Sequence, residues 1–150
     1  MTNHQRTAHW LKTCGKEPHN ANHASVQAGV DLEETAELMK CMRVSQDGWQ
    51  RVLERIVIDM NDLADAIKSG KVVAHFPNHL RTDVLDALCD REVTGNGLAF
   101  LLGFDKDAAD QEVLRSNDSK LNEDGTPVLL PGGKIGKSRR YRAPNLEAFS

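Results

Sequence analysis

Two acidic stretches hold the residues best placed to do chemistry. In DLEETAELMK, residues 31–40, three glutamates share about one and a half turns of an expected helix, and the like charges of Glu33 and Glu37 cost such a helix about 0.2–0.5 kcal/mol. Steps of four and three residues from Val30 give the stripe Glu34, Glu37, Cys41 and Val44. Carboxylates therefore interrupt a line of core-type residues, although the same pattern also fits the solvated edge of a helix.

The second acidic stretch is RTDVLDALCDREV, residues 81–93. Its aspartates Asp83, Asp86 and Asp90 follow i, i+3, i+7 spacing, which places them on one helical face. Ionised carboxylates on faces turned toward a helical bundle repel one another and are costly to desolvate. A hard divalent cation removes that cost, and carboxylate oxygens suit Mg²⁺ or Mn²⁺ better than zinc. The two stretches together predict a metal site able to bind phosphate oxygens.

Helices must position these residues. The hydrophobic pattern predicts helices over 5–13, 22–44, 48–68, 79–102 and 106–117. Asn20 or Asn22 is expected to cap the second of these, Asp105 to cap the fifth, and Gly103 to end the fourth. The 48–68 helix carries a predicted core stripe of Leu53, Ile56, Met60, Leu63 and Ile67. No strand pattern is strong enough for a sheet.

These elements predict one all-α domain over residues 1–150, a bundle of four to five helices. From about residue 121 the chain is rich in Gly, Pro and basic residues, so 121–150 is expected to be an irregular tail. Short helices in a chain of 150 residues leave apolar stripes uncovered, which favours a homodimer or homotetramer.

Composition narrows the class of protein further. The net charge of −3 and an aromatic content of 5% give no sign of stable nucleic-acid binding, and no apolar run approaches the roughly 20 residues of a membrane span. The N-terminus lacks a signal-peptide apolar region. The three cysteines show no CxxC spacing, so reduced thiols are expected. We therefore expect a cytoplasmic protein without membrane partners.

Three segments resemble the MazG-like, phosphoribosyl-ATP pyrophosphohydrolase-like superfamily of all-α nucleotide pyrophosphohydrolases, and in particular its small phage-type members. LEETAEL, residues 32–38, is similar to the EExxE helix of that superfamily. LDALCDREVTGNGLAFLLGFD, residues 85–105, resembles its second acidic helix. EVLRSNDSK, residues 112–120, resembles its RSNxxK element and is followed by DGTPV and YRAPNLEAF. The resemblance runs in order over residues 7–149.

The resemblance implies hydrolysis of a nucleoside triphosphate to the monophosphate and pyrophosphate, with Mg²⁺ or Mn²⁺ as cofactor. Glu34 and Glu37 match metal ligands of the first acidic helix, and Asp90 matches the aspartate of an ExxD motif. Ala87 stands where that motif has glutamate. Asp86, one residue earlier, is expected to supply the missing carboxylate, with the number of metals left open, and Asp83 is a reserve ligand.

The remaining roles follow from the metal-site hypothesis, the RSNxxK match and the local composition. Glu33, beside the proposed ligands on the helix, is the candidate for orienting or deprotonating the attacking water, with a plain surface glutamate as the alternative. Arg115 and Lys120 are expected to reach phosphate, with a solvated helix end as the alternative, and Asn117 to bond the base or sugar. GKIGKSRRYR, residues 133–142, is either a solvated basic tail or a flap that closes over phosphates; a nucleic-acid arm has less support because the rest of the chain is acidic.

Several functions stay open at this point. The substrate is expected to be a deoxynucleoside triphosphate, with conversion of dGTP to dGMP one specific possibility, in the host cytoplasm if the chain is phage-encoded. Phosphoribosyl-ATP hydrolysis is an alternative enzyme activity. The alternative from another class is a non-catalytic helical interaction module that kept the fold, for which Ala87 is the best support.

Overall fold

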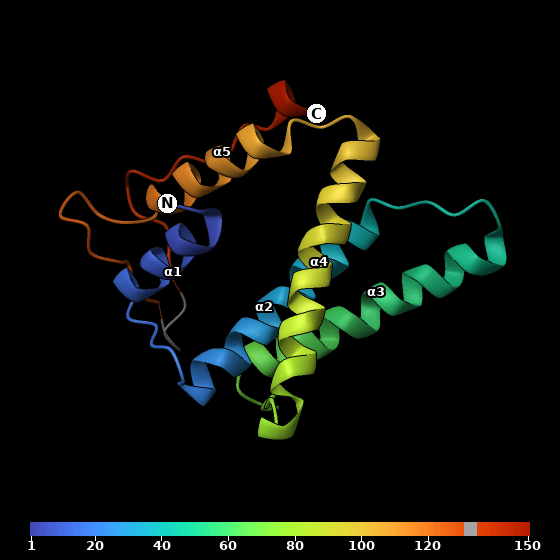
Figure 1. Cartoon of the computed structure of the whole chain (residues 1–150), viewed down its shortest axis with the longest axis horizontal. Coiled ribbons are helices and arrows are strands. Elements are labelled where there is room, and N and C mark those ends of the chain that lie inside the picture. Colours follow the sequence, from blue (N-terminus) through green and yellow to red (C-terminus); the bar gives the residue numbers. More distant parts are fainter. Residues whose placement is uncertain (131–134) are drawn as a thin grey trace. The chain divides into compact units, whose positions relative to one another are not determined.

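A computed structural model describes residues 1–130 and 135–150 of the chain, and it is all-α (Figure 1). Over the described residues the helices are α1 (Asn3–Thr13), α2 (Ala21–Lys40), α3 (Asp47–Lys68), α4 (Arg81–Leu102) and α5 (Lys106–Asp118). Single turns of 3₁₀-helix cover Asn78–Leu80 and Glu147–Phe149. In the described part of the chain, β-structure is limited to isolated bridges in the tail. The predicted fold class is confirmed.

Capping side chains set the helix bounds close to those predicted. The side-chain oxygen of Asn20 accepts a hydrogen bond from the His23 amide at 3.1 Å and begins α2. Asp105 does the same for α5 through the Ala108 amide, also at 3.1 Å. Gly103 ends α4 in the left-handed region, at φ +80°, which glycine adopts without a steric cost. The second helix ends at Lys40, four residues before the predicted end at residue 44.

The chain, expected to form one domain, contains two compact units. Residues 18–75 make the first unit, and residues 1–17 together with 76–150 make the second. The first unit is a hairpin of α2 and α3, and the second contains α1, α4, α5 and the C-terminal tail. The acidic stretches of the sequence thus belong to different units.

The α2–α3 hairpin packs through small residues on α2. The buried residues are Ser25, Gly29 and Ala36 on α2, and Leu53, Val57, Ala64 and Ile67 on α3. A Cβ atom on Gly29 would lie 3.0 Å from the Ala64 carbonyl oxygen, so the two backbones approach closely at this point. Ser25 also accepts a hydrogen bond from the Ala74 amide at 3.0 Å and fixes the chain after α3.

This packing corrects both predicted stripes. On α2 the buried face lies beside the predicted line from Val30 to Val44, of which Glu34, Glu37, Cys41 and Val44 are exposed. On α3 the stripe is right at Leu53 and Ile67, whereas Ile56 and Leu63 are 41% and 46% exposed. The reason is physical: helices in close backbone contact meet at glycine, serine and alanine, which a search for large apolar residues passes over.

In the second unit, α1 packs on α5. The Trp10 indole donates a hydrogen bond to the Asn117 carbonyl at 3.1 Å, and Arg6 pairs with the Asp118 carboxylate at 3.1 Å. Residues 137–149, here called the C-terminal strap, run back along α5, and the Asp105 amide donates to the Phe149 carbonyl at 2.9 Å (Figure 1). Helix α4 is exposed along most of its length.

All three cysteines are free thiols. Cys14 is buried, whereas Cys41 at the end of α2 and Cys89 on α4 are exposed. Burial raises the pKa of the Cys14 thiol, although the nearby charges of Lys16 and Lys120 act in the opposite direction. Among the helices of the described residues, none has the length and apolar character needed to cross a bilayer.

Candidate functional site

Glu33 on α2 contacts a lysine of α3. Its carboxylate lies 2.7 Å from the Lys68 ammonium, which also lies 2.9 Å from Asp65. The hydrogen bond with Glu33 is the largest cause of a raised pKa at Lys68; Asp65 acts in the same direction and partial burial opposes both. Lys68 therefore stays cationic and holds the Glu33 carboxylate at one place on the hairpin.

The two predicted metal ligands of α2 lie on its exposed side. Glu34 and Glu37 are three residues apart and are both exposed, away from the face that packs on α3. The Cys41 thiol donates a weak hydrogen bond to the Glu37 carbonyl at 3.5 Å, which continues the helix end without using the carboxylate. The two carboxylates therefore lie on the exposed side of α2, whose opposite side packs on α3.

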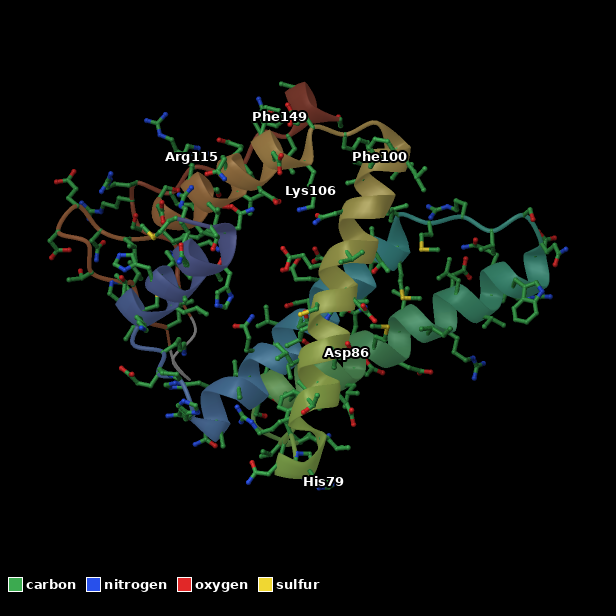
Figure 2. The ribbon with its side chains drawn as sticks, viewed as in Figure 1. His79, Asp86, Phe100, Lys106, Arg115 and Phe149 are labelled. Carbon is green, nitrogen blue, oxygen red and sulfur yellow. The ribbon has the colours of Figure 1, made fainter. Side chains whose placement is uncertain are left out.

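The aspartates of α4 are exposed as well. Asp83, Asp86 and Asp90 share one side of the helix, and Figure 2 places Asp86 in its N-terminal half and Phe100 in its last turn. Thr94 donates to the Asp90 carbonyl at 2.9 Å, so the Asp90 carboxylate itself is not used by that contact. Ala87 is exposed beside them.

Carboxylates from α2 and from α4 belong to different units. Within the described residues, no group of three or more His, Cys, Asp or Glu side chains gathers as a metal site would require. Each helix by itself offers a pair with helical spacing: Glu34 with Glu37, and Asp86 with Asp90. The donor chemistry of both pairs, carboxylate oxygen alone, fits a hard divalent cation.

Asn117 and Lys120 lie together at the end of α5. The Lys120 ammonium donates to the Asn117 side-chain oxygen at 2.8 Å and lies 5.7 Å from the centre of the Trp10 ring. Trp10 in turn bonds the Asn117 carbonyl. An indole, an amide and an ammonium group thus meet at one place, a combination that suits an anionic ligand with a planar group.

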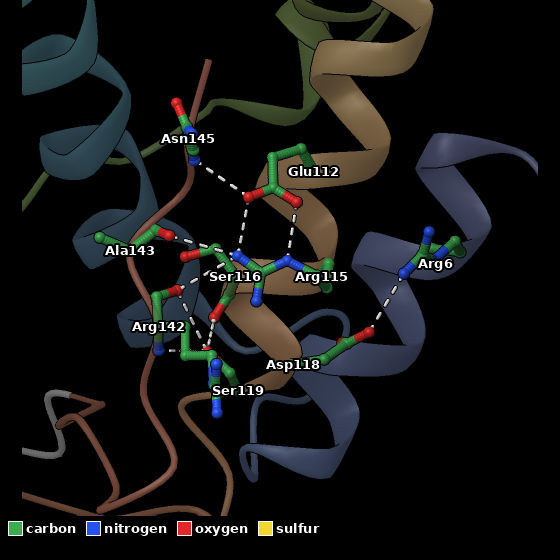
Figure 3. Close-up of polar contacts among 9 residues, drawn as sticks. All are labelled: Arg6, Glu112, Arg115, Ser116, Asp118, Ser119, Arg142, Ala143 and Asn145. Atoms are coloured by element: carbon green, nitrogen blue, oxygen red, sulfur yellow. Dashed lines mark hydrogen bonds and ion pairs between the residues drawn. The ribbon is translucent and has the colours of Figure 1, made fainter. Parts of the chain in front are cut away.

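Arg115 has a different environment from the one expected of a phosphate ligand. Its guanidinium forms a two-pronged contact with Glu112, at 2.7 Å and 2.8 Å, and donates to the Ala143 carbonyl at 3.2 Å (Figure 3). Glu112 also accepts a hydrogen bond from the Asn145 amide at 3.0 Å. The contacts from Arg115, and then from Asn145, lower the pKa of Glu112 to about 2.

Sequence reasoning missed Glu112 and the role of the strap. The available signal was the i, i+3 spacing of Glu112 and Arg115, which allows an ion pair on one helix but does not reveal its second partner. That partner, the backbone at Ala143 and Asn145, lies about thirty residues further along the chain. Residues 133 and 134 of the predicted basic segment lie outside the described residues.

Comparison with known proteins adds no assignment. No protein-family model matches the chain, and no curated protein or solved structure matches it either.

Proposed function

We propose that this protein is a metal-dependent nucleoside triphosphate pyrophosphohydrolase. The observation that carries the proposal is the pair of exposed all-carboxylate sets, on α2 and α4, in an all-α chain that also carries the RSNDSK segment at the end of α5. Glu34, Glu37, Asp86 and Asp90 are the proposed ligands of Mg²⁺ or Mn²⁺. Such a cation, when bound, neutralises triphosphate charge and makes bound water more acidic.

The chain's own residues supply binding and orientation. Glu33, held by Lys68 at 2.7 Å, is the proposed group that orients the attacking water and accepts its proton. Lys120 is the proposed ligand of phosphate oxygens, and Asn117 and Trp10 are the proposed contacts of the base or sugar. The proposed substrates are deoxynucleoside triphosphates, with dGTP the first to test, and the proposed setting is the cytoplasm.

A nucleotide panel tests the proposal. The full chain is incubated with each canonical deoxynucleoside and ribonucleoside triphosphate and with phosphoribosyl-ATP, in Mg²⁺ or Mn²⁺, and pyrophosphate release is measured. We expect turnover of at least one deoxynucleotide and its loss, by about 10²-fold or more, in Glu37→Gln. Absence of turnover for every nucleotide would instead favour the non-catalytic interaction module.

The role of Glu33 has a matched control in Asp65. Both carboxylates pair with Lys68, so Glu33→Gln and Asp65→Asn each remove one of its partners. If Glu33 acts on the water, only Glu33→Gln lowers kcat, by about 10²-fold or more. An equal loss in both variants would show that Glu33 only maintains the hairpin.

A further inference from the structure

The C-terminal strap carries a dense group of cations on an ordered backbone. Four of its six residues from 137 to 142 are basic: Lys137, Arg139, Arg140 and Arg142, and all four are exposed. Like charges this close repel one another, and the repulsion grows when the backbone prevents them from moving apart. A segment of this kind gains most from a ligand that brings several negative charges to one place.

Hydrogen bonds to α5 and to the two residues that follow it keep the strap in place. The Ser138 amide donates to the Lys120 carbonyl at 3.2 Å, and its hydroxyl donates to the Ser119 carbonyl at 2.9 Å. The Ser119 hydroxyl accepts from the Arg142 amide at 3.0 Å (Figure 3). Further along, Arg115 and Glu112 hold the backbone at residues 142–145. The basic residues therefore sit between two fixed points.

Residues of the RSNDSK segment take part in both fixed points. Ser119 and Lys120, which bond the strap, are its last two residues, and Lys120 also carries the contact to Asn117. The strap cations are thereby placed at the end of α5 where the proposed nucleotide contacts lie. The Arg115 guanidinium, by contrast, donates hydrogen bonds to the Glu112 carboxylate and to the carbonyls of Arg142 and Ala143.

Contacts of the other strap residues favour a phosphate chain over nucleic acid. The Lys137 ammonium lies 4.4 Å from the centre of the Tyr141 ring, so a cation already occupies a face of the strap's only tyrosine. Binding of single strands relies on open aromatic faces for base stacking. Arg140 uses one nitrogen on the Asn122 carbonyl at 3.3 Å, which leaves Arg139 and Arg142 as the exposed pair best suited to bind phosphate oxygens.

We propose that the strap is the triphosphate-binding element of this protein, with Arg139 and Arg142 as phosphate-binding residues and Arg115 as a positioning residue that anchors the strap. The proposal rests on the proposed function for the nature of the ligand. It reassigns Arg115, expected from the sequence to reach phosphate, and gives the basic segment the role of a preorganised phosphate clamp.

Binding of inorganic tripolyphosphate tests the clamp without requiring catalysis. The full chain is titrated calorimetrically with tripolyphosphate in the absence of metal. The double variant Arg139→Gln/Arg142→Gln is compared with Arg51→Gln/Arg55→Gln, which makes the same charge change at exposed positions of α3. We expect the strap variant to bind about tenfold more weakly or worse, because each lost contact is a charge-assisted hydrogen bond, and the α3 variant to bind as the wild type does.

Other results of that titration would overturn the clamp. These are absence of binding by the wild-type chain, equal losses in both double variants, or tighter binding of an oligothymidylate than of tripolyphosphate. Because tripolyphosphate binding is scored apart from turnover, a chain that binds it through the strap but hydrolyses no nucleotide would refute the proposed function and keep the clamp.

The positioning role of Arg115 has its own readout. In Arg115→Gln we expect faster hydrogen exchange of the Asn145 amide and weaker tripolyphosphate binding, although Arg139 and Arg142 are intact. With a hydrolysed nucleotide, KM should rise several-fold while kcat changes less than about twofold. Slow exchange at Asn145 together with a large loss of kcat would place Arg115 on the reacting phosphate and refute its anchoring role.

Discussion

Gly29 is the residue on which the contact between α2 and α3 depends. The space that a Cβ atom would occupy is limited by the Ala64 carbonyl oxygen at 3.0 Å and by the Lys68 and Ile67 side chains at 3.0 and 3.1 Å. A backbone carbonyl inside a helix cannot turn aside as a flexible side chain can. The same contact brings Lys68 to Glu33, so the packing residue and the proposed catalytic carboxylate depend on one helix spacing.

We predict that Gly29→Ala destabilises the protein by about 1–2 kcal/mol. Overpacking costs about 1–3 kcal/mol, and the better helix propensity of alanine returns up to about 1 kcal/mol. Gly48, in the first turn of α3, has no atom within 4 Å of its potential Cβ and serves as the control. Urea denaturation should show Gly48→Ala neutral or slightly more stable than the wild type; a stabilised Gly29→Ala would disprove the close approach.

The Glu112 carboxylate gives strap docking a defined pH dependence. Its pKa falls from 4.5 to about 2 because the charged form is bonded by Arg115 and by the Asn145 amide. A carboxylate with a depressed folded-state pKa contributes stability that is fully present above its unfolded value, here 4.5, and lost as pH falls through about 2.

We predict that the Asn145 amide signal in NMR titrates with a midpoint near pH 2. In Glu112→Gln this titration should vanish, whereas Glu147→Gln, at another strap carboxylate, should leave it in place. A midpoint near the ordinary value of 4.5 would mean that Arg115 and Glu112 do not pair in solution.

Helix α4 has little internal support for its length. Ala99 is the one buried residue among its 22, whereas Phe100 and Leu101 are each 81% exposed. Exposed apolar side chains on several sides of a helix are costly to leave in water. A contact between copies of the chain would cover this surface, and the homodimer or homotetramer expected from the sequence stays a prediction.

We predict that the wild-type chain has a mass of two or four chains in light scattering, and that Leu101→Asp lowers it. The charge placed on an apolar contact surface is costly to bury. Asn96→Asp adds the same charge at a polar position of α4 and should leave the mass unchanged. A wild-type chain that is monomeric at all concentrations would refute this prediction.

The sequence predicted the helices well and their packing partly. Caps such as Asn20 and Asp105 are local signals, so the starts of α2 and α5 could be read directly. The burial of Gly29 could not be predicted from the sequence, because a glycine indicates a close helix contact only when the partner helix is known. The anchoring of the strap by Arg115 depends on backbone carbonyls, which every residue has and no motif distinguishes.

At the scale of the whole molecule, the proposed metal ligands come from both compact units. Glu34 and Glu37 belong to the hairpin of residues 18–75, and Asp86 and Asp90 to the other unit. A cation held by either pair would stabilise the unit that carries that pair, because its binding free energy is available only to the folded site.

We predict that Mn²⁺ raises the unfolding temperature of the wild-type chain, by the equivalent of about 2.7 kcal/mol at one hundred times Kd. A chelator should reverse the shift, and Glu37→Gln in one unit or Asp90→Asn in the other should reduce it, according to which pair holds the cation. Asp62→Asn, on the exposed side of α3, is the control. Loss of the shift in only one of the two site variants would assign the metal to that unit, and an unchanged shift in both would refute both pairs as ligands.

The distribution of thiols gives the chain a built-in pair of spectroscopic reporters. Cys14 is buried and its raised pKa leaves little thiolate, whereas each compact unit carries one exposed cysteine, Cys41 in the hairpin and Cys89 on α4. Nitroxide labelling of the natural sequence should therefore modify one site per unit. Pulsed dipolar spectroscopy of that doubly labelled chain would then record the distance between the two labels as a distribution, in the presence and in the absence of nucleotide and Mg²⁺.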